Sequence, residues 1–400
     1  MHPPGADAVL VRHGEIGSKS PQVQHRMEGR LRDNVAAILS DRGLDDPVER
    51  RHSRLFVRTD PDRIEAVTAA ATDAFGVVSA SPAASTDPTL PGIRETLAAI
   101  AREHYTGGTF AIEAHRAGPA EAHPFSSGDI EDAGGTAVWE TAERLSVEPA
   151  VDLDDPDITL SVECRPDEAF VFLGTREGPG GLPVGTQQPL VALVSGGIDS
   201  PVAAWEAMRR GCPVHPLYVD LGAYGGPDHR LRAEATVADL ARYAPNHGLA
   251  LRVAPGGDAV ERLVAEMDSG RMLALRRFMF RVAERVAGEL GAVGIVTGEA
   301  IGQKSSQTSA NIRVTDAVTD LPVHRPLATV DKSDITERAR EIGTFEEATI
   351  PVGCHRVAPD TPATRASLST IREAEPDDIG DLAAEATQEV STVEPDPAAT

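Results

Sequence analysis

An apolar run that breaks into a glycine turn and continues as a helix constrains the fold of this 400-residue chain more than any other feature. Residues 190–194 read Leu-Val-Ala-Leu-Val, residues 195–200 read Ser-Gly-Gly-Ile-Asp-Ser, and a helical stretch then runs on to Gly211. Glycines let a backbone approach a phosphate, and the free N–H groups of the first helical turn point toward it. The pattern therefore predicts a phosphate site where a strand meets a helix.

The residues around the two glycines favour a nucleotide site over a plain structural connector. Ser195 and Ser200 add hydroxyl donors on both sides of the turn. Asp199 is unusual there, because phosphates repel a carboxylate unless a Mg²⁺ bridges them. The Gly-Lys-Ser/Thr ending of a Walker A loop is missing, so the turn is a different kind of phosphate loop.

The segments after residue 189 repeat strand then helix. Strands are expected at 213–219, 249–254 and 293–297, and helices at 229–241 and 272–290. Alternation of this kind predicts an α/β fold with a doubly wound parallel sheet, whose ligands bind at the carboxyl ends of the strands.

The rest of the chain divides into smaller units. Residues 1–75 alternate strand-like and helix-like segments, which suits a ferredoxin-like α+β domain, and residues 76–175 form a second α+β unit. Residues 176–188 are rich in Gly and Pro and are expected to be a linker. The phosphate-loop domain then spans 189–372, and the acidic, Pro-, Ala- and Thr-rich residues 373–400 are expected to be a disordered tail.

The charge balance predicts a protein from a salt-accumulating halophile. The formal net charge is −24, and among 38 basic residues only Lys19, Lys304 and Lys332 are lysines. In molar salt the Debye length falls to about 3 Å, so the self-repulsion of an acidic surface is screened. An ordinary acidic cytosolic enzyme is the alternative, but such a protein seldom avoids lysine so thoroughly. An acidic surface of this origin does not exclude a nucleic-acid partner.

The cysteines and the apolar runs indicate a cytoplasmic protein. No stretch reaches the length of a membrane span, and the N-terminus does not open a signal peptide. Cys164, Cys212 and Cys354 are far apart with no Cys-x-x-Cys spacing, which argues against a disulfide framework and a zinc finger. Cys164 and Cys212 adjoin apolar strands, so packing is the expected role of both.

A second polar constellation follows the expected strand at 293–297. Residues 296–308 read Val-Thr-Gly-Glu-Ala-Ile-Gly-Gln-Lys-Ser-Ser-Gln-Thr, so a strand again ends at a glycine and opens into a polar run. Arg325 and Lys332 place two cations ahead of a helix, and Cys354 lies beyond them in a loop. These residue types suit backbone that contacts an adenosine, cations that neutralise phosphate charge, and a sulfur nucleophile.

These motifs together resemble known families. The Ser-Gly-Gly-x-Asp-Ser turn resembles the PP-loop ATP pyrophosphatases, which cleave ATP to AMP and pyrophosphate. With Thr-Gly-Glu-Ala-x-Gly-Gln-x-Ser-Ser-Gln-Thr at 297–308, Arg-Pro-Leu at 325–327 and the loop cysteine, the chain resembles the ThiI family, the tRNA 4-thiouridine synthetases, up to about residue 370. Residues 109–138 resemble the THUMP domain, the RNA-binding module of that family.

The resemblance implies a reaction and the residues that perform it. ATP with Mg²⁺ would adenylate the C4 oxygen of the uridine at position 8 of tRNA, and a cysteine persulfide or sulfide would then deliver sulfur. Asp199, as a Mg²⁺ ligand through the phosphates, Lys332 and Cys354 are the implied catalytic residues, and Arg325 is a further candidate for charge neutralisation. The implied ATP-binding residues are Leu193, Val194, Ser195, Gly196, Gly197, Asp199, Ser200, Tyr218, Val219, Arg276, Gly298 and Gln307.

Some departures from the family and some alternatives remain open. The rhodanese domain of many family members is missing, so the persulfide is expected to form on Cys354 from a separate donor such as a cysteine desulfurase, or sulfide is used directly. No iron–sulfur cluster and no membrane partner are expected, and a homodimer is possible. The alternatives are another PP-loop tRNA-modifying ligase, which would not use Cys354, and a THUMP RNA-binding protein with a vestigial nucleotide site, against which the intact phosphate loop argues.

Overall fold

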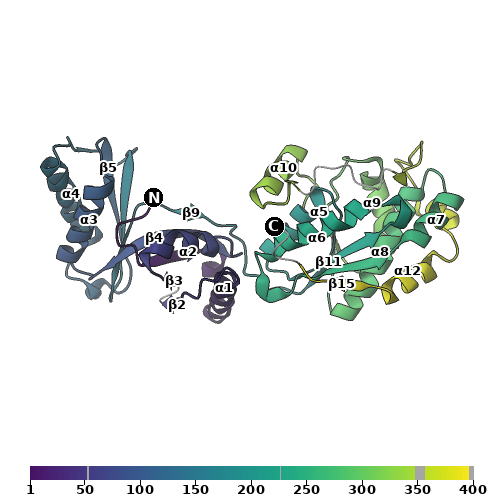
Figure 1. Ribbon diagram of the computed structural model, residues 1–400, viewed down its shortest axis with the longest axis horizontal. Helices are drawn as coiled ribbons and strands as arrows, with labels where there is room; N and C mark the ends of the chain where they lie inside the picture. The colour runs from purple at the N-terminus through teal and green to yellow at the C-terminus, as the bar shows by residue number, and fades with distance from the viewer. Residues whose placement is uncertain (52–53, 226, 347–355, 396–400) are drawn as a thin grey trace. The chain divides into compact units, whose positions relative to one another are not determined.

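The computed structural model describes residues 1–51, 54–225, 227–346 and 356–395, which form two compact units (Figure 1). One unit is Met1–Gly181 and the other is Leu182–Thr400. Within the described ranges, no helix has both the length and the apolar character needed to cross a bilayer.

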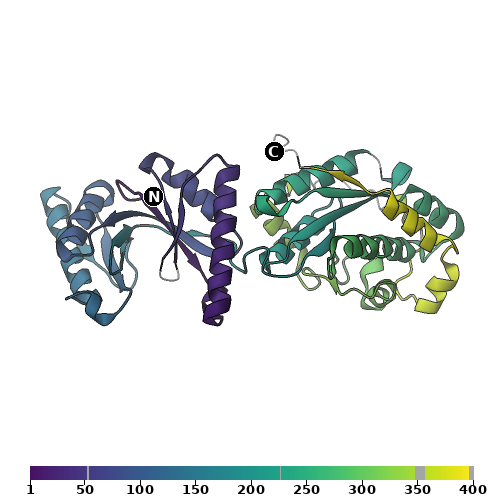
Figure 2. The same ribbon diagram turned by 90° about the horizontal axis from the view of Figure 1, so that it is seen from below.

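The N-terminal unit is built on one twisted sheet with the strand order β2-β3-β1-β4-β8-β7-β5-β6, and a short β9 pairs with β4. Figure 2 shows the long helix α1, in purple, at one end of this unit and the blue helices α3 and α4 at the other. The strands are β1 (Ala8–His13), β2 (Val48–Arg51), β3 (Arg54–Arg58), β4 (Val77–Thr86), β5 (Thr109–Arg116), β6 (Ala150–Val151), β7 (Ile158–Cys164), β8 (Ala169–Phe172) and β9 (Arg176–Glu177). The helices are α1 (Pro21–Asp41), α2 (Ile64–Ala71), α3 (Leu90–His104) and α4 (Ser127–Arg144).

Strand β4 joins the two predicted α+β domains into one sheet. It pairs antiparallel with β1, from the first predicted domain, and with β8, from the second. The boundary predicted at 75/76 therefore cuts in front of a strand that both halves share. With 10 residues, β4 is long enough to hydrogen-bond with strands on both of its sides.

The predicted linker is tied to both units by backbone hydrogen bonds. Gly180 N donates to the Val77 carbonyl at 2.8 Å, and Leu182 N donates to the Arg209 carbonyl at 2.9 Å. Gly180 and Gly181 have φ values of +66° and +76°, a region that favours glycine, so the chain can turn between these two attachments. The Gly- and Pro-rich segment is therefore hydrogen-bonded at both of its ends, and the division between the two units, at Gly181/Leu182, falls inside the predicted linker of 176–188.

The C-terminal unit confirms the predicted doubly wound α/β sheet. Its strand order is β14-β13-β10-β11-β12-β15, with every neighbouring pair parallel except β12 with β15. The strands are β10 (Leu190–Leu193), β11 (Val214–Asp220), β12 (Leu251–Pro255), β13 (Ile295–Val296), β14 (Val323–His324) and β15 (Ser391–Val393). The helices are α5 (Asp199–Arg209), α6 (Pro227–Ala241), α7 (Gly257–Glu266), α8 (Arg271–Leu290), α9 (Ser309–Asp316), α10 (Lys332–Glu341), α11 (Leu368–Ala374) and α12 (Ile379–Gln388).

The strand order places the binding crevice of this sheet. The chain runs from β10 outward to β11 and β12, and then crosses back to β13 on the opposite side of β10. Right-handed crossovers in two directions send the helices to opposite faces, so a crevice opens at the carboxyl ends of β10 and β13. The phosphate loop follows β10 and the second polar run follows β13, so both motifs arrive at this crevice.

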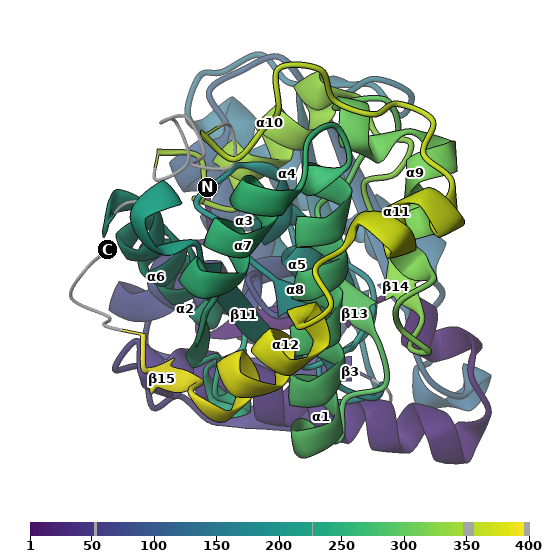
Figure 3. The same cartoon turned by 90° about the vertical axis from the view of Figure 1, so that its right-hand side faces the viewer.

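The C-terminal segment corrects the expectation of a disordered tail at 373–400. Helix α12 packs into the core through Ile379, Ala383 and Ala386, and β15 pairs antiparallel with β12. Figure 3 shows both elements in yellow against the C-terminal unit. This segment is rich in alanine, and alanines at helical spacing can bury one face of a helix as larger apolar residues do. For residues 375–395 the prediction of disorder is therefore wrong.

Candidate active site

A cavity of about 550 Å³ opens at the carboxyl ends of β10, β11 and β13. Lys332, Lys304 and Glu299 are on its wall. Every residue that the family resemblance implied for ATP binding also lines it: Leu193, Val194, Ser195, Gly196, Gly197, Asp199, Ser200, Tyr218, Val219, Arg276, Gly298 and Gln307. The strand ends and the two polar runs therefore converge on one enclosed space.

The phosphate loop between β10 and α5 is held by its own serines. Ser200 Oγ accepts a hydrogen bond from Ser195 N at 2.9 Å and donates to the Ser195 carbonyl at 3.1 Å. Helix α5 begins directly at Asp199, so the N–H groups of its first turn remain available at the cavity. The loop is thereby shaped as an anion cradle before any ligand arrives.

Gly298 lets the second polar run approach the phosphate loop. A Cβ at this position would lie 2.7 Å from the carbonyl carbon of Asp199 and 2.7 Å from the backbone nitrogen of Ser200. Real Cβ atoms do not come so close to backbone, so only glycine fits between β13 and the start of α5. The resemblance implied an ATP contact for Gly298, and the structure adds a packing reason for the same residue.

Asp199 and Lys332 meet across the mouth of the cavity. Lys332 Nζ lies 2.5 Å from Asp199 Oδ1, and the two side chains are 50% and 24% exposed. Asp199 is the first residue of α5 and Lys332 the first residue of α10, so two helix N-termini face each other here. Within the described residues, no group of three His, Cys, Asp or Glu side chains could hold a metal ion. A single carboxylate suits a Mg²⁺ that is shared with phosphates rather than one held by the protein alone.

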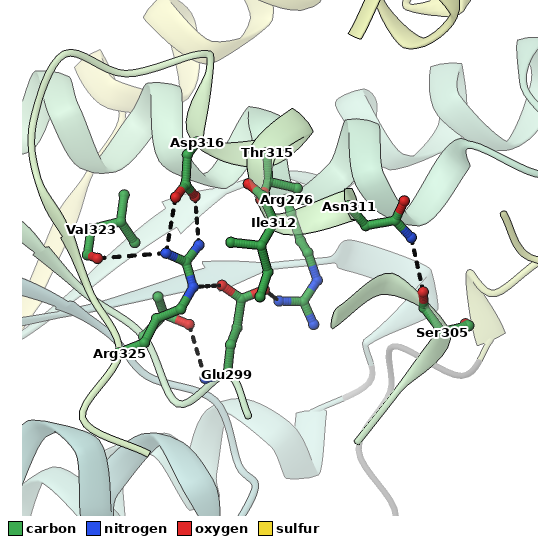
Figure 4. A network of polar contacts seen from close by, with 10 residues as sticks. Arg276, Glu299, Ser305, Asn311, Ile312, Thr315, Asp316, Val323 and Arg325 are labelled. Atoms are coloured by element: carbon green, nitrogen blue, oxygen red, sulfur yellow. Dashed lines mark hydrogen bonds and ion pairs between the residues drawn. The ribbon is translucent and has the colours of Figure 1, made fainter. Parts of the chain in front are cut away.

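A buried chain of alternating charges supports one wall of the cavity (Figure 4). Glu299 is 2% exposed and forms ion pairs with Arg276 through one oxygen and with Arg325 Nε, at 2.9 Å, through the other. Arg325 also donates two hydrogen bonds to Asp316, at 2.5 and 3.0 Å. The order Asp316–Arg325–Glu299–Arg276 ends at the cavity, because Arg276 lines it.

Arg325 does not have the place that the sequence suggested for it. Its side chain is 9% exposed and is not part of the cavity wall. Burial by itself lowers the pKa of Arg325, but the hydrogen bonds and charges of Asp316 and Glu299 outweigh burial and raise it. Two carboxylates already compensate this guanidinium, and its Nε donates to Glu299, which lines the cavity.

Three residues of this region were missed by sequence reasoning: Glu299, Asp316 and Asn311. Gln307, with its amide oriented to satisfy both neighbours, accepts from Arg276 at 3.1 Å and donates to the Ala300 carbonyl at 3.0 Å, so Glu299 and Gln307 both hold Arg276. Asn311 is fully buried and donates to the carbonyls of Ser305 and Ala363, at 2.9 and 2.8 Å. The spacing of polar residues along the sequence does not reveal which distant residue each of them will pair with. Glu299 was the one with a signal, because it follows Gly298 in the motif at 296–308.

The cysteines divide into two described residues and one outside the described ranges. Cys164 is fully buried, Cys212 is half-buried, and burial raises the pKa of both thiols. Neither is prepared as a thiolate nucleophile, which agrees with the packing role expected for both. Cys354 lies outside the residues that the structure describes.

Comparison with known proteins decides the family. Residues 8–81 match the ThiI ferredoxin-like domain, residues 88–173 the THUMP domain, and residues 185–378 the family described as thiamine biosynthesis protein ThiI. A Halobacterium salinarum protein called a probable tRNA sulfurtransferase is 59% identical over 394 residues, which cover 98% of this chain and 99% of that protein. The chain belongs to the ThiI family.

Further relatives and solved structures agree with this membership. A probable tRNA sulfurtransferase of Methanosarcina acetivorans is 39% identical over 372 residues, covering 91% of this ThiI-family chain and 88% of the relative. A crystal structure of a 4-thiouridine synthetase–RNA complex with bound ATP matches with a TM-score of 0.85 and 30% identity, over 97% of this chain and 100% of that one. The Halobacterium relative also fits the halophile interpretation of the composition.

Proposed function

We propose that this chain is an ATP-dependent tRNA sulfurtransferase that makes 4-thiouridine at tRNA position 8. The cavity at the β10–β13 crevice carries the proposal, because a preformed phosphate loop, Arg276 and the Asp199–Lys332 pair line one space. The relatives named probable tRNA sulfurtransferases support sulfur as the transferred group. The similar 4-thiouridine synthetase, whose structure contains RNA and bound ATP, supports RNA and ATP as the two substrates.

The residues of the cavity have separate tasks in the adenylation step. The N–H groups of the Ser195–Ser200 turn and of the first turn of α5 bind the phosphates, and Gly298 keeps the second polar run against them. A Mg²⁺ that enters with ATP would neutralise charge between the phosphates and Asp199. The uridine C4 oxygen attacks the α-phosphorus, the bond from that phosphorus to the bridging oxygen breaks, and pyrophosphate leaves.

Lys332 acts on the charge that this step creates. Its ammonium lies on Asp199, at the cavity mouth, so a small rotation of an exposed side chain carries it from the carboxylate to the phosphates. There it offsets the negative charge that develops on the pentavalent phosphorus. We propose that Cys354 carries the sulfur for the next step as a persulfide received from a persulfide donor. Its outer sulfur attacks C4 and AMP leaves, and a thiol reductant then cleaves the S–S bond, which frees the thiolated base and restores Cys354. If sulfide is the donor, it attacks C4 directly and AMP leaves.

The partners of the proposed reaction are tRNA and a sulfur donor. The N-terminal unit, which matches the THUMP family over residues 88–173, is the proposed binding module for tRNA. The donor is a persulfide carrier such as a cysteine desulfurase, or sulfide itself. We further propose that the protein forms a homodimer, holds no iron–sulfur cluster and acts in the cytoplasm, where free thiols stay reduced.

A matched pair of aspartate variants tests the assignment of the cavity. Asp199→Asn is expected to abolish nearly all tRNA-dependent pyrophosphate release, because the anchor of the Mg²⁺-bound phosphates is lost. Asp258→Asn is the control, since Asp258 also lies in the first turn of a helix that follows a strand but is not on the cavity wall. Normal pyrophosphate release by Asp199→Asn would remove the metal-binding role from this residue.

The cysteines test the sulfur step separately. Cys354→Ser is expected to abolish 4-thiouridine, scored by nucleoside mass spectrometry, while tRNA-dependent pyrophosphate release continues. Cys164→Ser and Cys212→Ser are the controls and should keep thiolation, because burial holds both thiols protonated. Continued thiolation by Cys354→Ser would mean that sulfide attacks C4 directly.

A further inference from the structure

The sheet of the N-terminal unit has two different faces. On β8, Ala169 and Val171 pack with α3 and α4, whereas Phe170 and Phe172 point to the opposite face. Strand register continues this second face across the sheet, because Phe172 pairs with Ala83, Ala83 with Ala8, and Leu10 with Phe56. The hydrophobic cluster on this face consists of strand residues: Ala8, Leu10, Phe56, Ala83 and Phe170, with Phe172 packed against them.

Arginine side chains cover the aromatic rings of this face. The rings of Phe56 and Phe170 are stacked, with 5.0 Å between their centroids. The guanidinium carbons lie over the rings as follows: Arg12 at 4.8 Å from Phe172, Arg58 at 5.4 Å from Phe170 and Arg165 at 5.2 Å from Phe56. Planar cations on aromatic rings are held in fixed positions, so their hydrogen-bond donors are oriented in advance.

Two arginines, Arg54 and Arg165, share one buried carboxylate, and Arg12 lies near them without an ion-pair partner among the described residues. Glu163 has a side chain that is 5% exposed, and it pairs with Arg165 at 2.6 Å and with Arg54 at 3.1 Å. Arg12 donates to Ser81 Oγ at 2.8 Å, and no carboxylate of the described residues lies within ion-pair distance of it. Burial and the charge of Arg54 lower the pKa of Arg12, and the charge of Glu163 only partly opposes them. In a chain with a net charge of −24, this cluster of Arg12, Arg54 and Arg165 has a local excess of positive charge.

We propose that the arginine cluster of Arg12, Arg54 and Arg165 binds a backbone phosphate of the RNA substrate. A guanidinium matches a phosphate with two parallel hydrogen bonds, and an added anion would balance the unpaired positive charge. Ser81 Oγ and Thr175 Oγ1, 3.0 Å apart, add hydroxyl groups beside Arg12. The hollow next to Arg58 and Arg165, which Asp167 and Glu168 also line, has a volume of only about 20 Å³ and is too small for a small-molecule ligand. A phosphate of a polymer would instead contact the solvent-exposed part of the cluster, where the Arg54 side chain is 21% exposed.

The inference rests on the proposed function, because it takes RNA as the substrate, and it identifies a contact surface on the N-terminal unit. The observations that carry it are the aromatic support of the arginines and the missing carboxylate partner of Arg12. The surface lies within Met1–Gly181, whereas the ATP cavity lies within Leu182–Thr400. Changes at Arg12 are therefore expected to alter RNA binding without altering ATP binding.

A charge-matched set of variants of the full chain tests the cluster. Fluorescein-labelled tRNA is titrated with each protein over a series of potassium chloride concentrations, and anisotropy gives the dissociation constant. Arg12→Gln is expected to raise it about tenfold, ~1.4 kcal/mol, and to lower the salt dependence by about one phosphate contact. Arg12→Lys keeps the charge but loses the planar group that makes two parallel hydrogen bonds, so its dissociation constant should lie between those of the unchanged protein and Arg12→Gln. Arg144→Gln removes an equal charge from an exposed site on α4, where Arg144 pairs with Glu140, and should bind like the unchanged protein.

Two further measurements separate RNA binding from a structural role. Removing Arg12 relieves its repulsion of Arg54 but also removes its contacts with Phe172 and Ser81. These effects oppose each other, so the melting temperature of Arg12→Gln should change little, and ATP binding by calorimetry should not change. Equal tRNA affinity and equal salt dependence of Arg12→Gln and the unchanged protein would overturn the phosphate site while leaving the proposed function intact. Failure of the unchanged protein to bind tRNA would overturn both. If Arg12→Gln does not fold, Arg54→Gln, which leaves Glu163 paired with Arg165, carries the same test.

Discussion

Replacing Glu299 by glutamine tests whether the buried charge chain holds Arg276 in the ATP cavity. The substitution keeps the shape of the side chain but removes the charge that Arg276 and Arg325 share. Breaking a buried ion pair by removing one partner costs about 3–5 kcal/mol. Arg325 keeps its two hydrogen bonds to Asp316, and Arg276 is 20% exposed, so we expect a smaller loss of about 2–3 kcal/mol in the free energy of unfolding.

Asp316→Asn is the matched control for this substitution. It also neutralises one carboxylate of the chain, but Asp316 is 37% exposed and Arg325 retains Glu299. Asp316→Asn is therefore expected to lower the free energy of unfolding by about 1 kcal/mol or less. Molar potassium chloride should reduce the loss of unfolding free energy in Asp316→Asn, because salt screens exposed charges. It should change the loss in Glu299→Gln little, because that carboxylate is 2% exposed.

Urea unfolding at fixed salt measures both penalties. Trp205 is 3% exposed in α5 and reports on the C-terminal unit, so the experiment uses a Trp139→Phe background, which leaves Trp205 as the sole tryptophan. ATP affinity is measured on the same proteins and should fall in Glu299→Gln, because Arg276 loses its carboxylate partner. Equal unfolding penalties for the two variants, or an unchanged ATP affinity in Glu299→Gln, would refute the idea that Glu299 positions Arg276.

Gly298→Ala should abolish ATP binding and lower the free energy of unfolding by about 1–3 kcal/mol, because the added Cβ would lie 2.7 Å from backbone atoms. Gly288→Ala is the control in calorimetry, because a Cβ there would have no atom within 4 Å. Deleting residues 375–400 should lower the melting temperature of the C-terminal unit far more than deleting 391–400, because only the longer deletion removes α12 and the carboxylate that pairs with the buried Arg277. Burial raises the pKa of both described thiols, so native protein in a Cys354→Ser background should react slowly with iodoacetamide at about pH 8.5, where an exposed cysteine is half ionised. The stability linked to these thiols is fully present below that pH and is lost as the pH rises through the raised pKa, which urea unfolding at several pH values measures; fast labelling of the folded protein would contradict this.

The local part of the nucleotide site could be predicted from the sequence. A strand, two glycines and a helix start within eleven residues at 190–200 determine the backbone of the phosphate loop, because each of these features acts on its immediate neighbours. The alternation of strand and helix after residue 189 likewise determined the doubly wound sheet and hence the crevice at the strand ends. The residues implied by family resemblance came with these motifs, and the structure brings them to one cavity wall.

The pairing of charges depended on tertiary structure. Arg325 looked like a free cation ahead of a helix, yet Glu299 and Asp316 compensate it, and both partners reach it only when β13, β14 and α9 come together. No sequence motif pointed to Arg12, yet the fold places its guanidinium over the ring of Phe172, 160 positions along the chain. Ion pairs have no periodicity along a sequence, because any two charged positions can meet if the fold brings them together.

The sequence by itself determined what neighbouring residues control: the phosphate loop, the order of strands and helices, and the acidic, lysine-poor surface. Only the tertiary structure decided that β4 joins two domains into one sheet, that the residues after 374 complete the C-terminal core, and which arginine faces the cavity. The physical reason is the same in each case. Edge strands, alanine-rich helices and single charges have weak local preferences, so their positions depend on the partner surface that distant parts of the chain provide.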